Sequence, residues 1–324
     1  MLASFGRVGM SVRVTAAGLE TATVINPDAA SDPAMARLLV APRVPLRAAS
    51  VLPATVTGLS TGGWDPRATL DYVPAFMARM GVSSPADLLA RETGIDYRSD
   101  IVPWLGNEMA TATLPGGILG ETVYLLSVKD EAAAASGVAK VMGVLRDRLP
   151  GLLDQLESLG EGAGVAPIEL RDSGLPTTTT TINGTAVTTY PFADTVAVHA
   201  AVRNGFLYLT GSDAAMRDLL ADGPRLSESP RYRATMARVP AGATGHGFSD
   251  VGGTLKAISP IMSGLLGFVL SETDEIGSAE ANRLAGQVGN FLDFAAARAG
   301  VQVTWTETTN FGLRAKSFLP VKWQ

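Results

Sequence analysis

The chain has 324 residues, of which 46% are hydrophobic and 18% are charged, and its formal net charge is -5. This length suits two modest hydrophobic cores, the hydrophobic content excludes wholesale disorder, and the acidic balance gives no electrostatic reason to bind nucleic acid. Cysteine is absent, which excludes disulfides, thiolate catalysis and Cys-ligated metal centres and fits an extracytoplasmic setting.

The first part of the chain predicts a strand pair and then helices. Residues 1–14 carry arginine but lack the apolar segment of a signal peptide. Ser11–Val24 is typical of strand, turn and strand. Asp65-Pro66 places a side-chain acceptor at a helix N-cap and proline at the first helical position. Ser84-Pro85 predicts a short helix that ends at Gly94.

Three hairpins are predicted in the middle of the chain. Asn-Gly between two β-prone segments is a strong hairpin signal, because both turn positions require a positive φ. Two such turns are Asn183-Gly184 and Asn204-Gly205, and Pro115-Gly116-Gly117 marks the third. The predicted strand pairs are Glu108–Leu114 with Thr122–Val128, Thr177–Ile182 with Thr185–Tyr190, and Thr195–Arg203 with Phe206–Thr210.

Helices are predicted after Asp130, after Ser229-Pro230, and in a last long segment that ends at Gly300. The most apolar segment, Ile258–Leu270, is too short to span a bilayer and is interrupted by Pro260. We expect it to be a buried helix, with an interfacial membrane segment as the alternative. Gln302–Phe318 predicts a final strand pair.

Strands thus come mostly as adjacent pairs, which favours an α+β fold of antiparallel sheets built from hairpins, with helices packed on one face. The predicted organisation is internally duplicated: a partial leading unit of a hairpin and a helix at 1–48, a first α+β unit at 49–192 and a second at 193–324.

The duplication rests on short matches that occur in the same order in both units. Leu52–Gly58 resembles Val239–Gly245, and Ala34–Leu39 resembles Ala215–Leu220. We therefore expect Pro53 and Pro240 each to precede a strand that leads into a helix. Because pseudo-symmetric proteins tend to bind ligands between their halves, we expect the ligand or partner site at that junction. Its expected residues are Trp64, Trp104, His246 and Phe248.

One segment also resembles a known family. Asp96–Glu108 contains an acidic stretch that leads into Pro103-Trp104-Leu105-Gly106 and an acidic residue before a strand. It resembles bacterial domain-of-unknown-function family 3352 in this pattern. The resemblance implies a bacterial protein with no established activity, often held by an N-terminal membrane anchor. In its own physical terms, Trp104 is expected to fill the core and to need a hydrogen-bond partner for its indole N–H.

Recognisable catalytic machinery is absent from the sequence. The two histidines, His199 and His246, are expected to be ordinary strand residues, and the glycine-rich segments lack nucleotide-binding spacing. Asp96, Asp100 and Glu108 could form a carboxylate pair or a calcium site, but Asp96 and Asp100 are expected to cap and solubilise a turn. We predict no catalytic, cofactor or metal residues.

The sequence therefore favours a non-enzymatic bacterial module that binds a partner or scaffolds the cell envelope. An apolar ligand could lie among methionines, with Met77, Met80, Met142, Met236 and Met262 as candidate lining residues. The alternative function is a carboxylate-based hydrolase. By resemblance we expect an extracytoplasmic or membrane-associated location, with the cytoplasm as the alternative, and no transmembrane segment in this chain.

Overall fold

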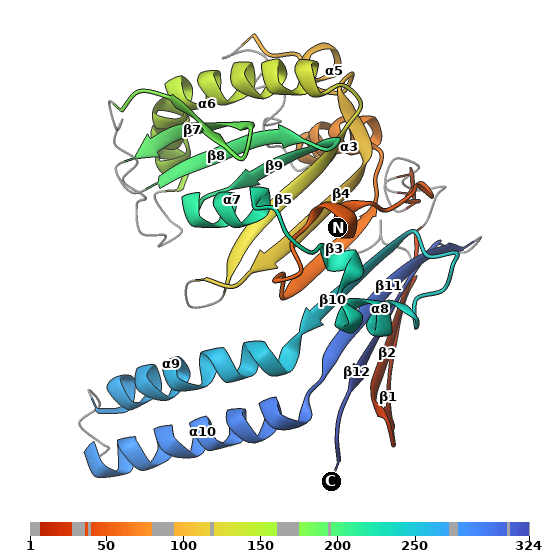
Figure 1. The fold of residues 1–324 in the computed structure, drawn as a ribbon, viewed down its shortest axis with the longest axis vertical. Coiled ribbons are helices and arrows are strands. Elements are labelled where there is room, and N and C mark those ends of the chain that lie inside the picture. The colour runs from red at the N-terminus through yellow and green to blue at the C-terminus, as the bar shows by residue number, and fades with distance from the viewer. Residues whose placement is uncertain are drawn as a thin grey trace.

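The computed structural model describes residues 7–27, 36–37, 40–79, 94–116, 120–160, 175–193, 196–271, 278–309 and 312–323. Within these ranges the strands form one antiparallel sheet of twelve in the order β1-β2-β12-β11-β10-β3-β4-β5-β9-β8-β7-β6 (Figure 1). Helices pack against this sheet. The predicted α+β class, with an antiparallel sheet built from hairpins, is therefore confirmed.

The strands form five hairpins and two single strands at the centre. The hairpins are β1 (Arg7–Thr15) with β2 (Gly18–Asn26), β4 (Leu105–Leu114) with β5 (Glu121–Val128), β6 (Thr178–Ile182) with β7 (Thr185–Ala193), β8 (Val196–Arg203) with β9 (Phe206–Thr210), and β11 (Val301–Thr309) with β12 (Gly312–Pro320). The central strands are β3 (Gly58–Gly63) and β10 (Gly245–Asp250).

Both predicted Asn-Gly turns have the backbone geometry that motivates them. Asn183 and Asn204 have φ angles of 46° and 55°, and Gly184 and Gly205 have 75° and 76°. All four turn residues therefore lie in the left-handed region that suits a two-residue hairpin turn. The three predicted hairpins and both predicted terminal strand pairs are present.

Three of the helices begin where the sequence predicts. The described helical elements are α2 (Ala48–Val51), α3 (Pro66–Arg79), α5 (Tyr97–Asp100), α6 (Glu131–Gly160), α7 (Asp213–Leu220), the 3₁₀ turn η2 (Leu226–Glu228), α8 (Pro230–Met236), α9 (Val251–Ser271) and α10 (Ser278–Arg298). The three helices with the predicted start are α3, α6 and α8. The helix predicted from Ser84-Pro85 lies outside the described residues.

The sheet has two halves that meet where β3 pairs with β10, a contact that we call the junction. The first half runs from β3 through β4, β5, β9, β8 and β7 to β6, and the second half from β10 through β11, β12 and β2 to β1. Each half receives a hairpin from a distant part of the chain: β9 pairs with β5, and β2 pairs with β12. All three segments of the predicted domain division thus contribute strands to one continuous sheet.

The first half is covered on both faces. Leu207 and Tyr208 are neighbours on β9, so their side chains point to opposite faces of the sheet. Tyr208 belongs to a cluster with Met216 of α7, whereas Leu207 belongs to a cluster with Val138 of α6. Helix cover therefore extends to both faces of this half.

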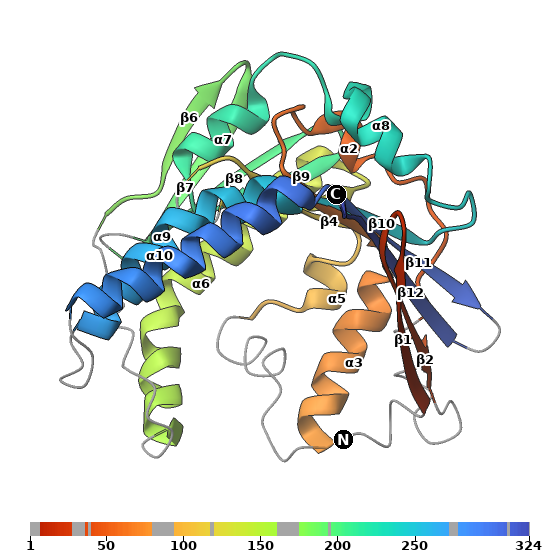
Figure 2. The ribbon, with the colours of Figure 1, turned by 90° about the horizontal axis from the view of Figure 1, so that it is seen from below.

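The second half has less helix cover: α8 packs against β10 and β11, but α9 and α10 do not cover the sheet. Helices α9 and α10 lie side by side and project away from the sheet as a pair that we call the helical arm (Figures 1 and 2). The prediction of a buried helix at Ile258–Leu270 is wrong. The segment is helical, but only 6% of the apolar window Val251–Leu270 is buried, because among the described residues α9 packs mainly against α10.

Candidate functional site

The junction has hydrogen bonds that repeat from one half to the other. In the first half, the Thr57 N–H and Oγ1 both donate to the carbonyl of Thr113, at 2.9 and 3.2 Å. In the second half, the Thr244 N–H and Oγ1 donate to the carbonyl of Thr306 at 2.8 and 3.3 Å. Thr57 and Thr244 are therefore in equivalent positions, one before each central strand.

The pairing of the two central strands has the same symmetry. The N–H of Gly63 donates to Thr244 O, and the N–H of Asp250 donates to Thr57 O, both at 2.9 Å. In the antiparallel register, Gly58 pairs with Ser249 and Gly62 pairs with Gly245. The pair Ser60–Gly247 lies midway between them, so a local two-fold axis passes close to it.

Each central strand leads into a helix through an equivalent aspartate. Asp65 Oδ1 accepts from the Ala68 N–H, and the Asp65 carbonyl accepts from Thr69 Oγ1. Asp250 accepts from the Gly253 N–H and from Thr254 Oγ1 in the same two ways. The predicted order of proline, strand and helix is thus present in both segments, with an isolated bridge at Pro53 and the Ala243 N–H bonded to Pro240 O.

Two cavities lie at the two ends of the junction. One has a volume of about 240 Å³ and includes Thr244, Thr306 and Trp64 in its lining. The other has a volume of about 210 Å³ and is lined in part by Thr57 and Thr113, the equivalents of Thr244 and Thr306. The local symmetry therefore relates the cavities as well as the strands. We call them the Trp64 cavity and the Asp250 cavity.

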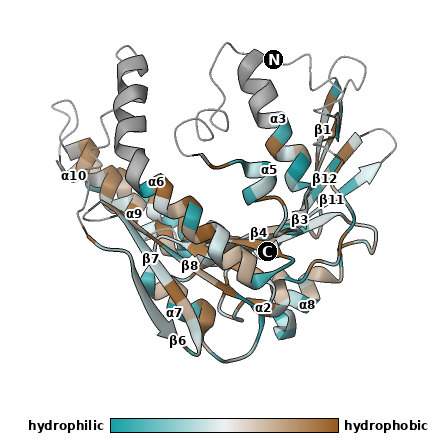
Figure 3. Ribbon diagram, turned by 90° about the horizontal axis from the view of Figure 1, so that it is seen from above, coloured by the Kyte–Doolittle hydropathy of each residue, from teal (hydrophilic) through white to brown (hydrophobic). Residues whose placement is uncertain are grey.

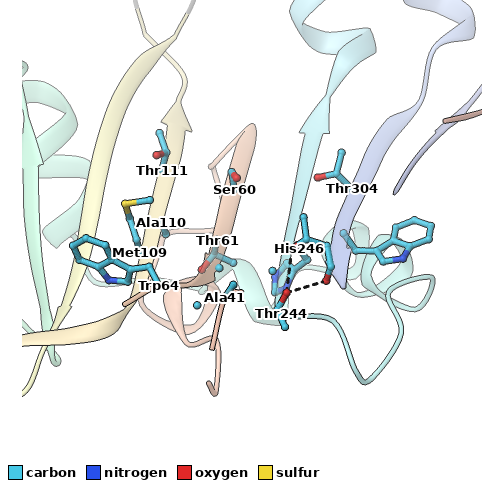
Figure 4. A pocket seen from close by; sticks show the side chains of 15 residues that line it. Ala41, Ser60, Thr61, Trp64, Met109, Ala110, Thr111, Thr244, His246 and Thr304 are labelled. Atoms are coloured by element: carbon cyan, nitrogen blue, oxygen red, sulfur yellow. Dashed lines mark hydrogen bonds between the residues drawn. The ribbon is translucent and has the colours of Figure 1, made fainter. Parts of the chain in front are cut away.

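The Trp64 cavity is uncharged (Figure 4). Ser60, Thr111 and Thr304 bring hydroxyl groups to it, and Met109, whose side chain is 46% exposed, adds an apolar contact. Gly62, Gly245 and their neighbours leave the backbone of the sheet open to close approach. The complete lining is Ala41, Ser60, Thr61, Gly62, Gly63, Trp64, Met109, Ala110, Thr111, Thr244, Gly245, His246, Thr304, Trp305 and Thr306.

Two tryptophans border this cavity, and the indole N–H of each makes no hydrogen bond within the described part of the structure. The Nε1 atoms of Trp64 and Trp305 are buried and have no hydrogen-bond partner among the described residues. A buried indole N–H without an acceptor costs free energy. Trp305 is a residue that sequence reasoning missed. It pairs with His246 of β10, and its position between Thr304 and Thr306 in a predicted strand is the signal that could identify it.

The opposite face of the junction is a closed polar cluster. Glu108 is only 3% exposed and accepts hydrogen bonds from the Arg47 and Ala48 N–H groups and from Thr61 Oγ1, at 2.8 to 2.9 Å. The donors satisfy the carboxylate and hold the start of α2 on the sheet. Glu108 therefore serves the fold rather than an open site.

His246 is partly buried and is bonded to a neighbouring helix. It lies between Gly245 and Gly247 on β10, and its Nε2 lies 2.8 Å from the hydroxyl of Tyr232. Burial lowers the pKa of His246 and raises the pKa of Tyr232 to about 12, with the charge of Glu108 adding to the second shift. Both groups are thus neutral near pH 7, and neither is poised for catalysis.

The four predicted site residues fall into two groups. Trp64 and His246 line the Trp64 cavity. Phe248 is 3% exposed and packs edge-on against Tyr232, and Trp104 is 6% exposed with its Nε1 donating to Asp100 O at 2.7 Å. Trp104 is therefore a core residue with the hydrogen-bond partner that its indole requires, and neither it nor Phe248 lines the cavity.

The other candidate chemical groups are bonded within the fold. Asp96 caps α5, Asp100 pairs with Lys140 at 2.9 Å, and the hydrogen bond from Lys140 lowers the pKa of Asp100. His199 lies 3.0 Å from Thr189 Oγ1, and burial lowers its pKa. Among the described residues, no group of three His, Asp or Glu could hold a metal ion.

The methionines proposed to line one apolar cavity are dispersed. Met142 packs beside Trp104 in one cluster, and Met236 packs in the other. Met262 is 42% exposed on α9. The side chains of Met77 and Met80 lie outside the described part of the structure. The three described methionines therefore do not share a site.

Comparisons with known proteins add little. No protein-family model and no curated protein matches this chain. One solved structure, described as "Structure of crystal form I of TP0453", is similar to it with a TM-score of 0.31 and 9% sequence identity. The similarity covers 83% of this chain and 77% of that one, and it is too distant to carry an argument.

Proposed function

We propose that the chain is a non-enzymatic binding module that holds an uncharged, hydroxyl-rich ligand, such as an oligosaccharide, along the junction. The single observation that carries this proposal is the symmetric pair of cavities, in which Thr57 and Thr113 line one end and Thr244 and Thr306 line the other. The ends of β3 are about 17 Å apart. A short chain of sugar units can span that distance.

The chemistry of the lining selects the class of ligand. Serine and threonine hydroxyls both donate and accept hydrogen bonds, so they match sugar hydroxyls without an ionic contact. The Trp64 cavity has no charged side chain in its lining. In the Asp250 cavity, the Asp250 carboxylate is engaged by Arg231 at 2.6 Å. A charged ligand would therefore find no compensating charge in either cavity.

The same lining disfavours the alternative of a carboxylate hydrolase. Such an enzyme needs two carboxyl groups that face each other across the substrate. The lining of the Asp250 cavity contains one carboxylate, and that of the Trp64 cavity contains none. Glu108 lies close by but is closed off by its three donors.

The proposed module arose by duplication of a unit that contains a central strand, its helix and a following strand pair. The repeated hydrogen bonds at Thr57 and Thr244 and at Asp65 and Asp250 support this origin. Membership of bacterial family 3352, through the Asp96–Glu108 segment, remains part of the proposal. It supports an extracytoplasmic location, where neutral glycans are available ligands.

Isothermal titration calorimetry of the full chain with oligomers of glucose and of N-acetylglucosamine tests the proposal. Ser60 is exposed at the centre of the junction, between the two cavities. We expect Ser60→Trp to fill this position and lower the affinity for the bound oligomer by about tenfold or more. The matched control is Ser50→Trp, at an exposed residue of α2's last turn, which should leave the affinity unchanged.

Either of two results would contradict the proposal. The first is that neither oligomer series binds the wild-type chain. The second is that the Ser60→Trp and Ser50→Trp variants bind the oligomer with equal affinity. Near-ultraviolet circular dichroism of both variants shows whether each retains the native packing of its aromatic residues. A folded Ser60→Trp variant with lost binding supports a site at the junction.

A further inference from the structure

The helical arm exposes large apolar side chains on both of its helices. On α9, Met262, Leu265 and Val269 are 42%, 55% and 50% exposed, and on α10 Phe291 is 66% exposed. Figure 3 shows hydrophobic residues along the projecting helices. Single exposed apolar residues are ordinary, but a group of them on one projecting element marks an interaction surface.

The two helices of the arm pack through small residues. Ser259 Oγ donates to the carbonyl of Gly289 at 3.2 Å, and Ala281 and Ala285 are 0% and 5% exposed. Ser263 lies one turn after Ser259 and donates back to its carbonyl. These residues define which side of each helix faces the other helix.

Four of the exposed apolar residues lie on one broad face of the arm, and Phe268 and Phe294, which are 65% and 54% exposed, lie opposite the contact side at its outer edges. Successive residues of a helix are rotated by about 100°. Measured from the contact side, Met262, Leu265 and Val269 lie to one side of α9, and Leu284 and Phe291 lie to one side of α10. Because the helices run antiparallel, these two sides coincide. We call this set the apolar face of the arm.

The other broad face is small or polar. At the same rotation, Pro260 and Gly264 of α9 and Asn282, Asn290 and Asp293 of α10 lie on it, and all five are exposed. The arm is therefore amphipathic as a pair of helices. Amphipathic helices in general can lie in the plane of a membrane interface, with their apolar side in the acyl region.

We propose that the helical arm docks in the plane of a lipid bilayer through this apolar face. The helix window Val251–Leu270 is long and apolar enough for contact with hydrocarbon, with a mean hydropathy of 1.4. No charged residue occurs between Lys256 and Glu272. The sequence between the helices contains Glu272, Asp274 and Glu275, whose transfer into hydrocarbon is costly, so the arm does not enter tip first.

A lipid surface fits this face better than a second copy of the chain. A specific protein interface carries about one hydrogen bond per 100–200 Å². The five side chains that define the apolar face cannot make one, whereas lipid contact requires none; the exposed side chains of Glu280 and Gln287 lie at its margin on α10. Arg298, whose guanidinium carbon lies 3.6 Å from the ring centre of Phe294, stands near the sheet end of the arm on the side of Phe291, where a basic side chain can reach toward anionic headgroups.

Flotation with vesicles of phosphatidylcholine and phosphatidylglycerol tests this proposal on the full chain. We expect the wild-type chain to float with the vesicles. The triple substitution Leu265→Ser, Val269→Ser and Phe291→Ser should lower the bound fraction by about tenfold or more, because three exposed apolar side chains leave the acyl region. All three positions are at least 50% exposed, so their replacement removes no core contact.

The matched control removes three exposed apolar side chains from the edge strand β1. Val8, Met10 and Val12 are 60%, 77% and 63% exposed, and their replacement by serine should leave flotation unchanged. Equal losses in the two triple variants would mean unspecific adhesion and would overturn the proposal. A wild-type chain that stays with the buffer would also overturn it.

Mass measured by light scattering separates the lipid surface from a second copy. We expect a monomer in buffer for both the wild-type and the arm variant. A wild-type dimer that the arm substitutions convert to monomers, without vesicle binding by either, would assign the apolar face to self-association and contradict the proposal. A Leu265→Trp variant adds a depth test, because its fluorescence should be quenched by brominated lipid chains.

Discussion

The two halves of the sheet share backbone geometry at the junction but differ in what covers them. In the first half, α6 covers one face and α2 and α7 cover the other, and most fully buried side chains lie there, Tyr208, Phe206 and Leu125 among them. In the second half, the buried strand residues are few, such as Val303 and Phe318; only α8 packs on these strands, and α9 and α10 project as the arm. The same arrangement of strands thus supports a closed core on one side and exposed surfaces on the other.

The difference shows which contacts determine each part of the structure. Hydrogen bonds such as those of Thr57 and Thr244 are made largely by the backbone, so they persist where side chains diverge. Whether helices cover a half of the sheet depends instead on side-chain contacts. Glu108 in the first half and Val301 in the second half each pair with the last residues of a central strand, but only Glu108 anchors another element.

The largest expected effect on stability concerns Glu108 and its counterpart Val301. Glu108→Ala should lower the free energy of unfolding by about 3 kcal/mol, because it leaves the Arg47 and Ala48 N–H groups and the Thr61 hydroxyl without their acceptor. Val301→Ala should cost less than about 1 kcal/mol, since Val301 is only partly buried. Urea denaturation measures both. Equal costs would show that the halves do not differ in this way.

A second comparison concerns the turns of the two hairpins that join each half from a distant part of the chain, β8–β9 and β1–β2. Gly205 has a φ of 76°, and an added Cβ would lie 3.1 Å from Nη2 of Arg47. Gly205→Val should therefore cost about 2 kcal/mol. Ala17→Val, in the exposed turn between β1 and β2, should change stability by less than about 0.5 kcal/mol. Thermal unfolding decides, and equal midpoints would contradict the turn assignment. Gly162, a natural loop control, lies outside the described residues.

The smallest expected effect is on pH dependence. Burial lowers the pKa of both His246 at the junction and His199 in the first half. The unfolded chain titrates these groups near pH 6.5, so below that pH it binds more protons than the folded chain. Stability is therefore full above about pH 7 and falls as the pH drops toward 5.5.

Urea melts at pH 7.5 and 5.5 measure this slope. His199→Asn and His246→Asn should each reduce it, because each removes one group that is protonated more readily in the unfolded chain. An unchanged slope in both variants would mean that other groups determine the acid sensitivity. Carboxylates contribute mainly below this window, since their ordinary pKa values lie near 4.

Much of the fold could be predicted from local sequence, because hairpin turns and helix caps are encoded within a few residues. Asn204-Gly205 determines a turn by its own backbone preference, and Asp65-Pro66 determines a helix start. The pairing of β9 with β5 and of β2 with β12 could not be predicted in this way. Those contacts join segments distant in sequence, and no local pattern specifies such a partner.

The junction as a ligand site stays a prediction. The repeated Pro-Ala segments indicate the junction, and two of its four predicted residues, Trp64 and His246, line a cavity. For Trp104 the sequence allowed both a core position and a site position, because an aromatic side chain near a turn can do either, and the structure places it in the core. The helical arm was misassigned because an apolar segment has the same composition whether protein or lipid covers it.

Hydrogen exchange of the full chain, with and without vesicles of phosphatidylcholine and phosphatidylglycerol, tests the contrast between the halves most directly. We predict strong protection of β4, β5 and β9 in both conditions, and weak protection of α9 and α10 that rises when vesicles are added. Protection of the arm equal to that of β5 without vesicles, or no change in the arm on their addition, would contradict the account.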